Sequence, residues 1–304
     1  MDANDGLAGL FETHRGQLCA VAYRMLGSSD EADDAVQEAW FRLSRADLGG
    51  VEDLAAWLRT VVARLCLDML RTRRSRREEP LEWQPPAPAR EGDPEREAVL
   101  VDSVGRAMLV VLDTLAPAER VAFVLHDLFA VPFAQIAPIV DRTPAATKKL
   151  ASRARHRVRG VTTVPDGELA AQRRVVEAFL AAARSGDLGA LLAVLAPDVT
   201  RRADRAALTP DRETVIHGAD AVAREMLVFG RRSRLAEPAL VNGTAGAVVA
   251  PYGRLLLAIA ITVADGRVAE YDIIADPEHL RRLDLAVLPP ERAAAAPGRS
   301  RTTG

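Results

Sequence analysis

Positive charge is concentrated in one short stretch of the chain, residues 143–160. The stretch reads TPAATKKLASRARHRVRG and contains no acid, although the chain of 304 residues has a formal net charge of -2 at pH 7. Its lysines and arginines are Lys148, Lys149, Arg153, Arg155, Arg157 and Arg159. Arg and Lys bind phosphates and guanine edges, and a hydroxyl such as that of Ser152 does either more weakly. The clustering therefore points to a polyanionic partner.

The elements that must position these cations read as a helix-turn-helix. FAQIAPIV at 133–140 predicts a short apolar helix, DRT a turn, and Pro144 the first residue of the basic helix. Four residues that recur at a spacing of four are expected to face the core: Ala146, Leu150, Ala154 and Val158. The cations then lie on the solvent side, where a recognition helix enters the major groove of DNA. The alternative is a solvated basic face, and Pro138 inside the first helix predicts that this helix is short or kinked.

A second predicted helix, within DEADDAVQEAWFRL, combines acidic and amide groups on about one side. These groups are Asp33, Asp34, Gln37 and Glu38, and apolar residues that include Val36 and Trp40 occupy other positions of the same helix. Such a face suits a basic partner, mainly through steering and register. The alternative is an ordinary exposed acidic helix.

Composition limits the class of protein. A hydrophobic content of 49% and a charged content of 27% are typical of a soluble globular protein. We expect no membrane-spanning helix and no secretory signal, because the apolar runs are short and the N-terminus opens with acids. Cys19 and Cys66 are expected to be buried thiols in a reducing cytoplasm, with neither a disulfide nor a metal site, and no cofactor is expected.

The chain is expected to be multidomain, with helical units at 1–77 and 95–160, a Pro-rich acidic linker at 78–94, an α+β unit at 168–285 and a disordered tail at 286–304. The α+β unit opens with two predicted helices and continues in strand-like runs. These runs are LVNGTAGAVVA, RLLLAIAITV and RVAEYDIIA. Asp265-Gly266 between the last two is a hairpin signal. Helices followed by an antiparallel sheet favour the α+β class.

At this point the sequence resembles a known family. LDTLAPAERVAFVLHDLFAVPFAQIAPIVDRTPAATKKLASRARHRVR resembles the promoter-binding C-terminal region of bacterial sigma factors, and DEADDAVQEAWFRL with AWLRTVVARLCLDMLRTRR resembles their N-terminal region. The two-region layout is similar to that of the extracytoplasmic-function group. The third segment resembles the SnoaL-like, NTF2-related α+β cone that some of these sigma factors carry as an extension.

The resemblance implies a cytoplasmic factor with two partners, core RNA polymerase and promoter DNA, and no membrane partner. The polymerase would be bound at the clamp helices of its largest subunit and the flap of its second subunit. The residues for the clamp helices would be Asp33, Asp34, Gln37, Glu38 and Trp40. The DNA-binding residues would be Arg59, Arg64, Arg71, Arg73, Arg74, Arg76 and Arg77 in the promoter-opening helix, and Lys148, Lys149, Ser152, Arg153 and Arg155 in the helix-turn-helix.

The third segment leaves two functions open. A cone of this kind has an apolar cavity and serves elsewhere as an enzyme or as a passive binding module. Its polar candidates for a pocket are Asp204, His217 and Asp272, for which we expect no catalytic role, although an unknown small ligand remains an option. The alternative function is a SnoaL-like enzyme or ligand-binding protein fused to a plain helix-turn-helix regulator. The acidic helix argues against that alternative, because a plain regulator has no use for a polymerase-docking motif.

Overall fold

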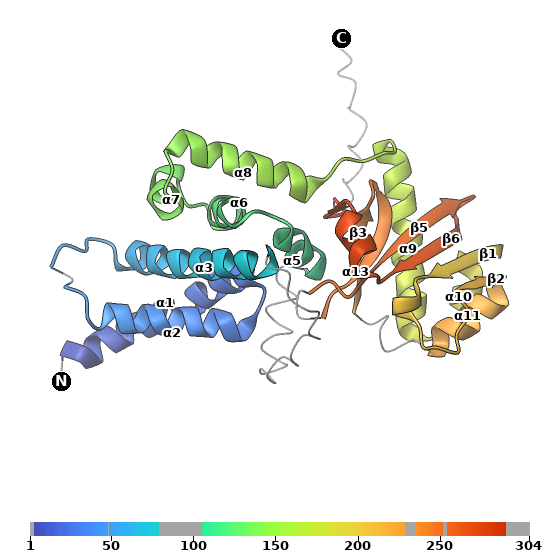
Figure 1. The fold of residues 1–304 in the computed structure, drawn as a ribbon, viewed down its shortest axis with the longest axis horizontal. Coiled ribbons are helices and arrows are strands. Elements are labelled where there is room, and N and C mark those ends of the chain that lie inside the picture. The colour runs from blue at the N-terminus through green and yellow to red at the C-terminus, as the bar shows by residue number, and fades with distance from the viewer. Residues whose placement is uncertain (1–2, 48, 79–104, 229–234, 252–253, 290–304) are drawn as a thin grey trace, which may run out of the picture.

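The computed structural model describes residues 3–47, 49–78, 105–228, 235–251 and 254–289 (Figure 1). Most of the predicted linker, the first residues of the second helical unit and residues 290–304 of the predicted tail lie outside these ranges. No helix among the described residues is long and apolar enough to cross a membrane.

Three helices form the N-terminal unit. They are α1 (Ala3–Leu26), α2 (Ser29–Leu43) and α3 (Leu54–Glu78). Ser28 begins α2, because its hydroxyl oxygen accepts a hydrogen bond from the backbone N–H of Glu31 over 3.4 Å. Asp53 acts in the same way at the start of α3, where its carboxylate accepts from the N–H of Ala56 over 2.9 Å. These caps set where the two helices that carry the acidic face and the arginines begin.

The second helical unit is built from shorter helices. They are α5 (Arg106–Asp113), α6 (Pro117–Phe123), the π-helical turn η1 (Val124–Leu128), α7 (Phe133–Val140) and α8 (Pro144–Arg159). Helix α7 contains Pro138 and has only eight residues, as the sequence predicts. It ends at Val140, and the next residue, Asp141, has a left-handed backbone with φ 55°. The turn there leads into α8, so that α7 and α8 form a helix-turn-helix.

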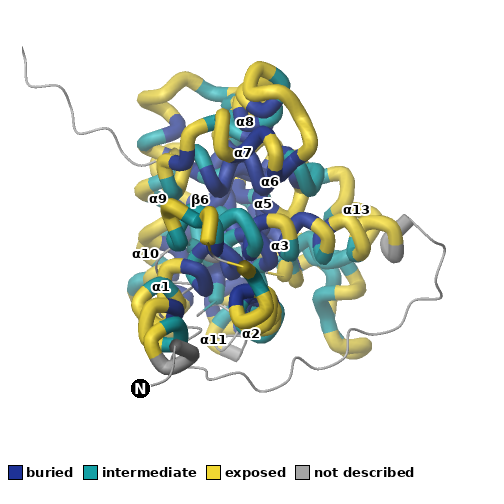
Figure 2. Tube along the Cα trace, turned by 90° about the vertical axis from the view of Figure 1, so that its left-hand side faces the viewer, coloured by how far each residue is buried: buried dark blue, intermediate teal, exposed yellow. Residues whose placement is uncertain are grey.

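The two helical units share one core. In Figure 1, α3 lies between the pair α1 and α2 on one side and α6 and α7 on the other. One buried cluster contains residues of both units, among them Val62 and Leu67 of α3 and Val121 and Ile136 of the second unit. In Figure 2 the buried segments gather in the middle of the molecule, around α5 and α6. The helical units are therefore packed together in this structure.

A mixed sheet with helices forms the C-terminal unit, which confirms the expected α+β cone. Its helices are α9 (Asp166–Ser185), α10 (Leu188–Val194), the 3-10 turn η2 (Arg205–Ala207), α11 (Ala219–Val228) and α13 (Pro277–Arg282). Its strands are β1 (Leu195–Ala203), β2 (Val215–His217), β3 (Ala236–Val241), β4 (Thr244–Val249), β5 (Leu257–Ala264), β6 (Arg267–Ile274) and β7 (Leu285–Ala286). The strand order is β2-β1-β6-β5-β4-β3-β7.

The sheet differs from the expected antiparallel one in its pairing. Strands β1 and β6 pair in parallel, which the long connection between them in the chain permits. The run 240–250, expected as one strand, is a hairpin in which Asn242 and Gly243 both have positive φ, 51° and 84°. Asn-Gly is the usual pair for such a two-residue turn. The predicted hairpin at Asp265-Gly266 is confirmed.

The end of the chain that the structure describes is more ordered than the expected tail. Ala286 and Leu288 are buried, with 2% and 7% of their surface exposed. The backbone N–H of Val287 donates to the carbonyl oxygen of Val158 at the end of α8 over 2.9 Å. Burial of Ala286 and Leu288 and the hydrogen bond from Val287 thus hold this segment against the rest of the protein. The sequence alone did not reveal these contacts.

Candidate functional site

Helix α8 carries the basic cluster and buries one side against α6 and α7. Thr143 caps it, since its hydroxyl accepts a hydrogen bond from the N–H of Ala146 over 3.2 Å. The buried residues are Thr147, Ala151, Ala154 and Val158. Of the expected core row at 146, 150, 154 and 158, Ala154 and Val158 are buried and Leu150 is half-buried against the core, while Ala146 is half-buried and belongs to no core cluster of the described residues. A strict repeat of four drifts around a helix of 3.6 residues per turn, so the buried side follows spacings of four, three and four.

The predicted DNA-binding residues of α8 fall into two groups. Lys148, Lys149 and Ser152 are exposed on the surface. Arg153 is held by Glu119 of α6, with Nε 2.8 Å from Oε1, and Arg155 is held by Asp127 of η1, with Nε 2.5 Å from Oδ1. Among the described residues, no acid forms an ion pair with Lys148 or Lys149, whereas Arg153 and Arg155 must leave Glu119 and Asp127 before they can bind a ligand.

Glu119 is the centre of this ion-pair network. Its side chain is 9% exposed, and it also accepts a hydrogen bond from Arg157 over 3.4 Å. Both arginines are more than half exposed, so the pairs are screened by solvent on one side. Glu119 therefore orients the side chains of Arg153 and Arg157 of α8 without burying them.

The acidic side of α2 borders a groove against α1. Gln37, Trp40 and the half-buried Asp33 line this groove of about 370 Å³ together with Phe11 of α1. The rings of Phe11 and Trp40 are tilted with centroids 5.1 Å apart. Asp34 and Glu38 are exposed, and Glu38 accepts a hydrogen bond from Arg42 over 3.0 Å. Three of the five predicted docking residues, Asp33, Gln37 and Trp40, therefore line the groove, whereas Asp34 and Glu38 are not among its lining residues.

Sequence reasoning missed two neighbours of this surface. Phe11 forms part of the groove, and Phe41 is 44% exposed beside Gln37 and Glu38. Phe41 could have been noticed in the sequence, because it follows Gln37 by four positions and Glu38 by three on the same predicted helix. Phe11 could not be found in this way, since it lies on another helix.

The arginines of α3 are divided between internal contacts and exposed positions. Arg71 pairs with Asp68 at 3.5 Å, and Arg73 donates to the carbonyl oxygen of Leu26 over 2.9 Å. Arg59 is half-buried, and Arg74 is exposed beside a groove that Arg157 also lines. The side chains of Arg76 and Arg77 lie outside the described residues.

Arg64 joins the two helical units. Its Nη2 donates to the carbonyl oxygen of Pro138 in α7 over 3.3 Å. On the neighbouring side of the interface, the guanidinium of Arg24 lies over the ring of Phe129, 5.2 Å from its centroid. Arg120 of α6 is buried near Cys66 of α3, and burial outweighs its charge so that the pKa of the Cys66 thiol is raised to about 12. A helix expected to meet DNA is therefore covered in part by the second unit.

The cone is docked on the helix-turn-helix unit. Helix α5 has no cap of its own at Gly105, and Glu237 of β3 supplies one: its Oε2 accepts from the N–H of Ala107 over 3.2 Å. Gly160, at the end of α8, passes so close to Ala286 that an added Cβ would lie 2.4 Å from that residue's Cβ. Its φ of 64° also favours glycine. The joint is tight at both ends of the helix-turn-helix unit.

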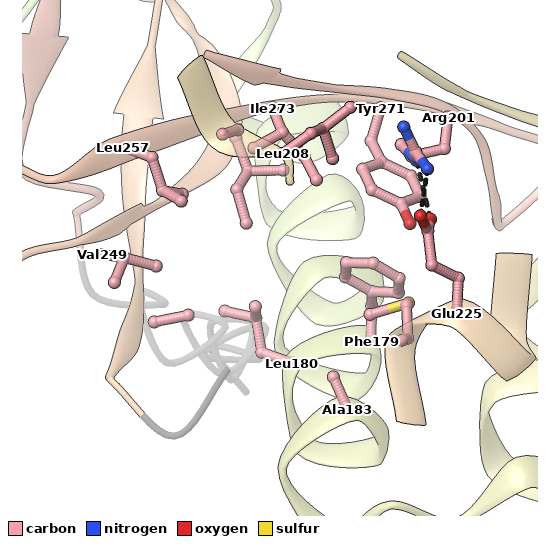
Figure 3. A pocket seen from close by; sticks show the side chains of 14 residues that line it. Phe179, Leu180, Ala183, Arg201, Leu208, Glu225, Val249, Leu257, Tyr271 and Ile273 are labelled. Atoms are coloured by element: carbon pink, nitrogen blue, oxygen red, sulfur yellow. Dashed lines mark hydrogen bonds and ion pairs between the residues drawn. The ribbon is translucent and has the colours of Figure 1, made fainter. Parts of the chain in front are cut away.

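The cone contains one well-formed apolar cavity among its described residues, of about 100 Å³ (Figure 3). Its polar groups are Arg201 of β1, Glu225 of α11 and Tyr271 of β6. Arg201 is fully buried and donates to Glu225, with Nε 2.9 Å from Oε2 and a second contact from Nη2. Its Nη1 donates to the carbonyl oxygen of Glu213 over 2.9 Å. Burial raises the pKa of Tyr271, so its phenol stays neutral.

The three polar candidates predicted for a pocket lie elsewhere. Asp204 accepts hydrogen bonds from the backbone N–H groups of Ala275 and Asp276, over 3.1 and 3.0 Å. His217 is exposed, with Nδ1 3.0 Å from the hydroxyl of Thr200, and Asp272 lies 3.7 Å from Nη1 of Arg202. None of the three lines the cavity. No sequence signal identified Arg201 and Glu225, because β1 and α11 were not expected as elements.

Comparisons with known proteins cover both helical units. Profiles of two families, Sigma-70 region 2 and Sigma-70, region 4, match residues 10–76 and 105–158. The chain is 38% identical over 312 aligned residues to the ECF RNA polymerase sigma factor SigJ of Mycobacterium tuberculosis (strain ATCC 25618 / H37Rv), covering 96% of this chain and 97% of that protein. It is 34% identical over 287 residues to the probable ECF RNA polymerase sigma factor SigI of the same strain, covering 92% and 97%. The crystal structure of SigJ aligns with 36% identity over 90% of this chain and 98% of that chain, with a TM-score of 0.44.

Proposed function

Since this chain belongs to the extracytoplasmic-function sigma factors of RNA polymerase, we propose that it binds core polymerase through α2, reads promoter DNA through α8, and is regulated in cis by its cone. The sigma-factor role in this proposal is carried by one observation: region 2 and region 4 occur in that order on one chain. A relative that aligns over nearly its whole length supports it. Promoters and polymerase lie in the bacterial cytoplasm, and that is where we propose it acts.

The polymerase-binding surface of this proposal is the groove between α1 and α2. Asp33, Asp34, Gln37, Glu38 and Trp40 would dock on the clamp helices of the largest subunit, with charge steering the encounter and the aromatic rings of the groove supplying apolar contact. The second helical unit would meet the flap of the second subunit. The exposed Phe41 extends the first surface and supports it.

The base-reading residues of this proposal are Lys148, Lys149 and Ser152, all three of which are exposed. Arg153 and Arg155 would serve as phosphate contacts once they exchange Glu119 and Asp127 for DNA. A contact of this kind contributes affinity and salt dependence more than sequence preference.

The arginines of α3 require a rearrangement in this proposal. Arg64 is bonded to the second unit, and α3 packs on α6 and α7. For α3 to reach separated DNA strands through Arg59, Arg64, Arg71, Arg73, Arg74, Arg76 and Arg77, the two helical units would have to move apart. We therefore infer that the packed arrangement is a closed state of the free factor.

Regulation by the cone rests on how it is joined to α5 and α8. Glu237 caps α5, and Val287 bonds the end of α8, so the cone contacts the helix-turn-helix unit at two separate points. A domain held in this way can bias an equilibrium between closed and open arrangements. The enzyme alternative has no support of this kind, because the charged groups of the cavity are paired with each other.

The test is in vitro transcription with core polymerase from one promoter. The full chain is compared with a chain that ends at Gly160 and with the full-length variant Glu237→Ala, after circular dichroism has verified that each is folded. Promoter-dependent transcripts with the full chain support the sigma function, and their absence contradicts it. A several-fold change in the truncated chain, reproduced in direction by Glu237→Ala, supports regulation in cis, and equal rates contradict it.

A further inference from the structure

The apolar cavity and the docking site of α5 lie on opposite faces of the same strands. In β3, Ala236 lines the cavity, while the next residue, Glu237, caps α5. Successive residues of a strand point to opposite faces of a sheet. One strand therefore contacts both the cavity and the helix-turn-helix unit.

The same alternation continues into the two neighbouring strands. Val249 of β4 and Leu257 of β5 line the cavity, and they are paired in one row with Ala236. The adjacent row consists of Glu237, Val248 and Ala258, which are also paired across the strands. Val248 and Ala258 belong to a buried cluster that includes Ala107 and Val110 of α5. The cavity row (Ala236, Val249 and Leu257) and the α5 row (Glu237, Val248 and Ala258) therefore lie on opposite faces of the same three strands.

The chemistry of the cavity selects a neutral ligand. Its walls are mostly aliphatic and aromatic, and its two charged groups, Arg201 and Glu225, neutralise each other. The remaining polar side chain, Tyr271, is a phenol directed toward Glu225 in Figure 3. An ion that entered the cavity would lose its hydration shell. Among the lining residues, all of which the structure describes, no uncompensated charge would replace that hydration.

The size of the cavity selects a small ligand. Its volume is about 100 Å³, and an engineered apolar cavity of about 150 Å³ takes up benzene. Since this cavity is the smaller of the two, a single ring or a short branched alkyl group is the upper limit of the ligand size. Ala207 and Leu208 after β1 are cavity residues that are only half-buried, so the cavity reaches the surface on their side.

We propose that the cone binds a small, neutral, apolar molecule of about one ring in this cavity, and that its occupancy is transmitted through the two rows to α5. A ligand adds contacts to Ala236, Val249 and Leu257, and it favours whichever arrangement of β3, β4 and β5 it contacts better. Those strands hold Glu237, Val248 and Ala258 against α5. The transmission to transcription rests on the proposed regulation in cis, whereas binding in the cavity does not.

The experiment uses the full chain with toluene as the probe and benzoate as an anionic probe with the same ring. Calorimetry in sealed cells is expected to give saturable binding of toluene and none of benzoate. Hydrogen exchange is expected to slow several-fold in β3 to β5 with toluene and to change in α5 at Ala107 and its neighbours. Absence of saturable toluene binding, or equal binding of benzoate, overturns the site. Binding without any change in α5 overturns the transmission.

Two variants of α9 locate the site. Ala183→Phe places a ring in the cavity and is expected to abolish toluene binding. Ala178→Phe puts the same ring on the exposed side of the same helix and is expected to leave binding unchanged. If Ala183→Phe does not fold, two measurements on the unmodified chain still test the binding site: the comparison of toluene with benzoate, and the hydrogen exchange of β3 to β5. Toluene binding together with unchanged transcription in Glu237→Ala would contradict the regulation in cis and leave the binding site standing.

Discussion

Glu237 on β3 of the cone caps helix α5 by accepting a hydrogen bond from the backbone N–H of Ala107 over 3.2 Å, across 130 positions of sequence. The first turn of a helix leaves N–H groups without intrahelical partners, and the residue before α5 is Gly105, which has no side chain to supply one. A helix of the DNA-binding unit thus depends on an acid of the C-terminal unit.

Replacing this acid should loosen the joint. Glu237→Ala is expected to cost about 0.5–2 kcal/mol, the usual range for losing a cap, and to speed hydrogen exchange in the first turn of α5. Glu237→Gln keeps an acceptor and should lose less. Glu278→Ala, whose side chain is 71% exposed in α13, is the matched control and should change little. Equal protection of Ala107 in all variants would contradict the capping role.

The recognition helix makes a prediction about sequence preference. Lys148→Ala is expected to cost about 1–3 kcal/mol in DNA binding and to relax specificity at one base pair, which is typical of a base contact. Arg153→Ala should weaken all sequences alike and reduce the salt dependence, because we assign Arg153 to a phosphate. A promoter library assayed at two salt concentrations measures both effects. An unchanged sequence preference in Lys148→Ala would show that Lys148 does not contact a base and belongs to a solvated surface.

The acidic face of α2 makes a prediction about polymerase binding. The double charge reversal Asp34→Lys and Glu38→Lys should weaken association with core polymerase, since both side chains are exposed and available for steering. The helical content of the isolated chain should be unchanged. Glu177→Lys and Glu278→Lys in the cone provide a control with the same change in net charge. Equal retention of both double variants on immobilised core polymerase would contradict the docking surface.

The thiol of Cys66 reports on the closed state. Burial raises its pKa from 9.0 to about 12, so the folded chain holds it protonated at pH 8 to 10 and the thiolate needed for alkylation is scarce. In a Cys19→Ser background, iodoacetamide should therefore react with Cys66 much more slowly than with a free thiol. Labelling should accelerate when core polymerase separates the helical units. Fast labelling of the free factor at pH 9 would contradict the closed arrangement around α3.

The same pKa has a consequence for stability. A thiol whose pKa is raised in the folded state leaves stability unaffected below pH 9, where it is protonated in both states. Above pH 9 the unfolded state releases the proton first, and the free energy of unfolding falls as the pH rises toward 12. Cys66→Ala should remove this part of the slope in denaturant melts between pH 8 and 10.5. An identical slope in Cys66→Ala and the parent would show that the thiol does not contribute.

The buried ion pair of the cone should be sensitive to the loss of one partner. Glu225→Gln leaves Arg201 buried without its counter-charge, which costs about 3–5 kcal/mol in comparable pairs. Glu270→Gln, which removes one of the two acidic neighbours of the exposed Arg202, is the matched control and should cost about 0–1 kcal/mol. Thermal unfolding of the two variants measures the difference. Equal melting temperatures would contradict the structural role of the pair.

Local signals in the sequence were sufficient for the helical half of the fold. Periodic apolar residues in α1 to α3, the turn and proline before α8, and the Asp265-Gly266 hairpin each depend on a few neighbouring residues, so they could be read without the structure. The basic face of α8 and the acidic face of α2 were found for the same reason. Their assignment to DNA and polymerase stays a prediction at the level of single residues.

Contacts between distant segments were decided only by the tertiary structure. The sequence could not show that β1 pairs in parallel with β6, that α3 packs against α6 and α7, or that Glu237 caps α5, because each depends on residues brought together from far along the chain. The cavity was missed for the same reason. Arg201 and Glu225 lie 24 positions apart on a strand and a helix, and only closure of the sheet around α9 makes them neighbours, whereas Asp204, His217 and Asp272 were directed by the same closure to its outside.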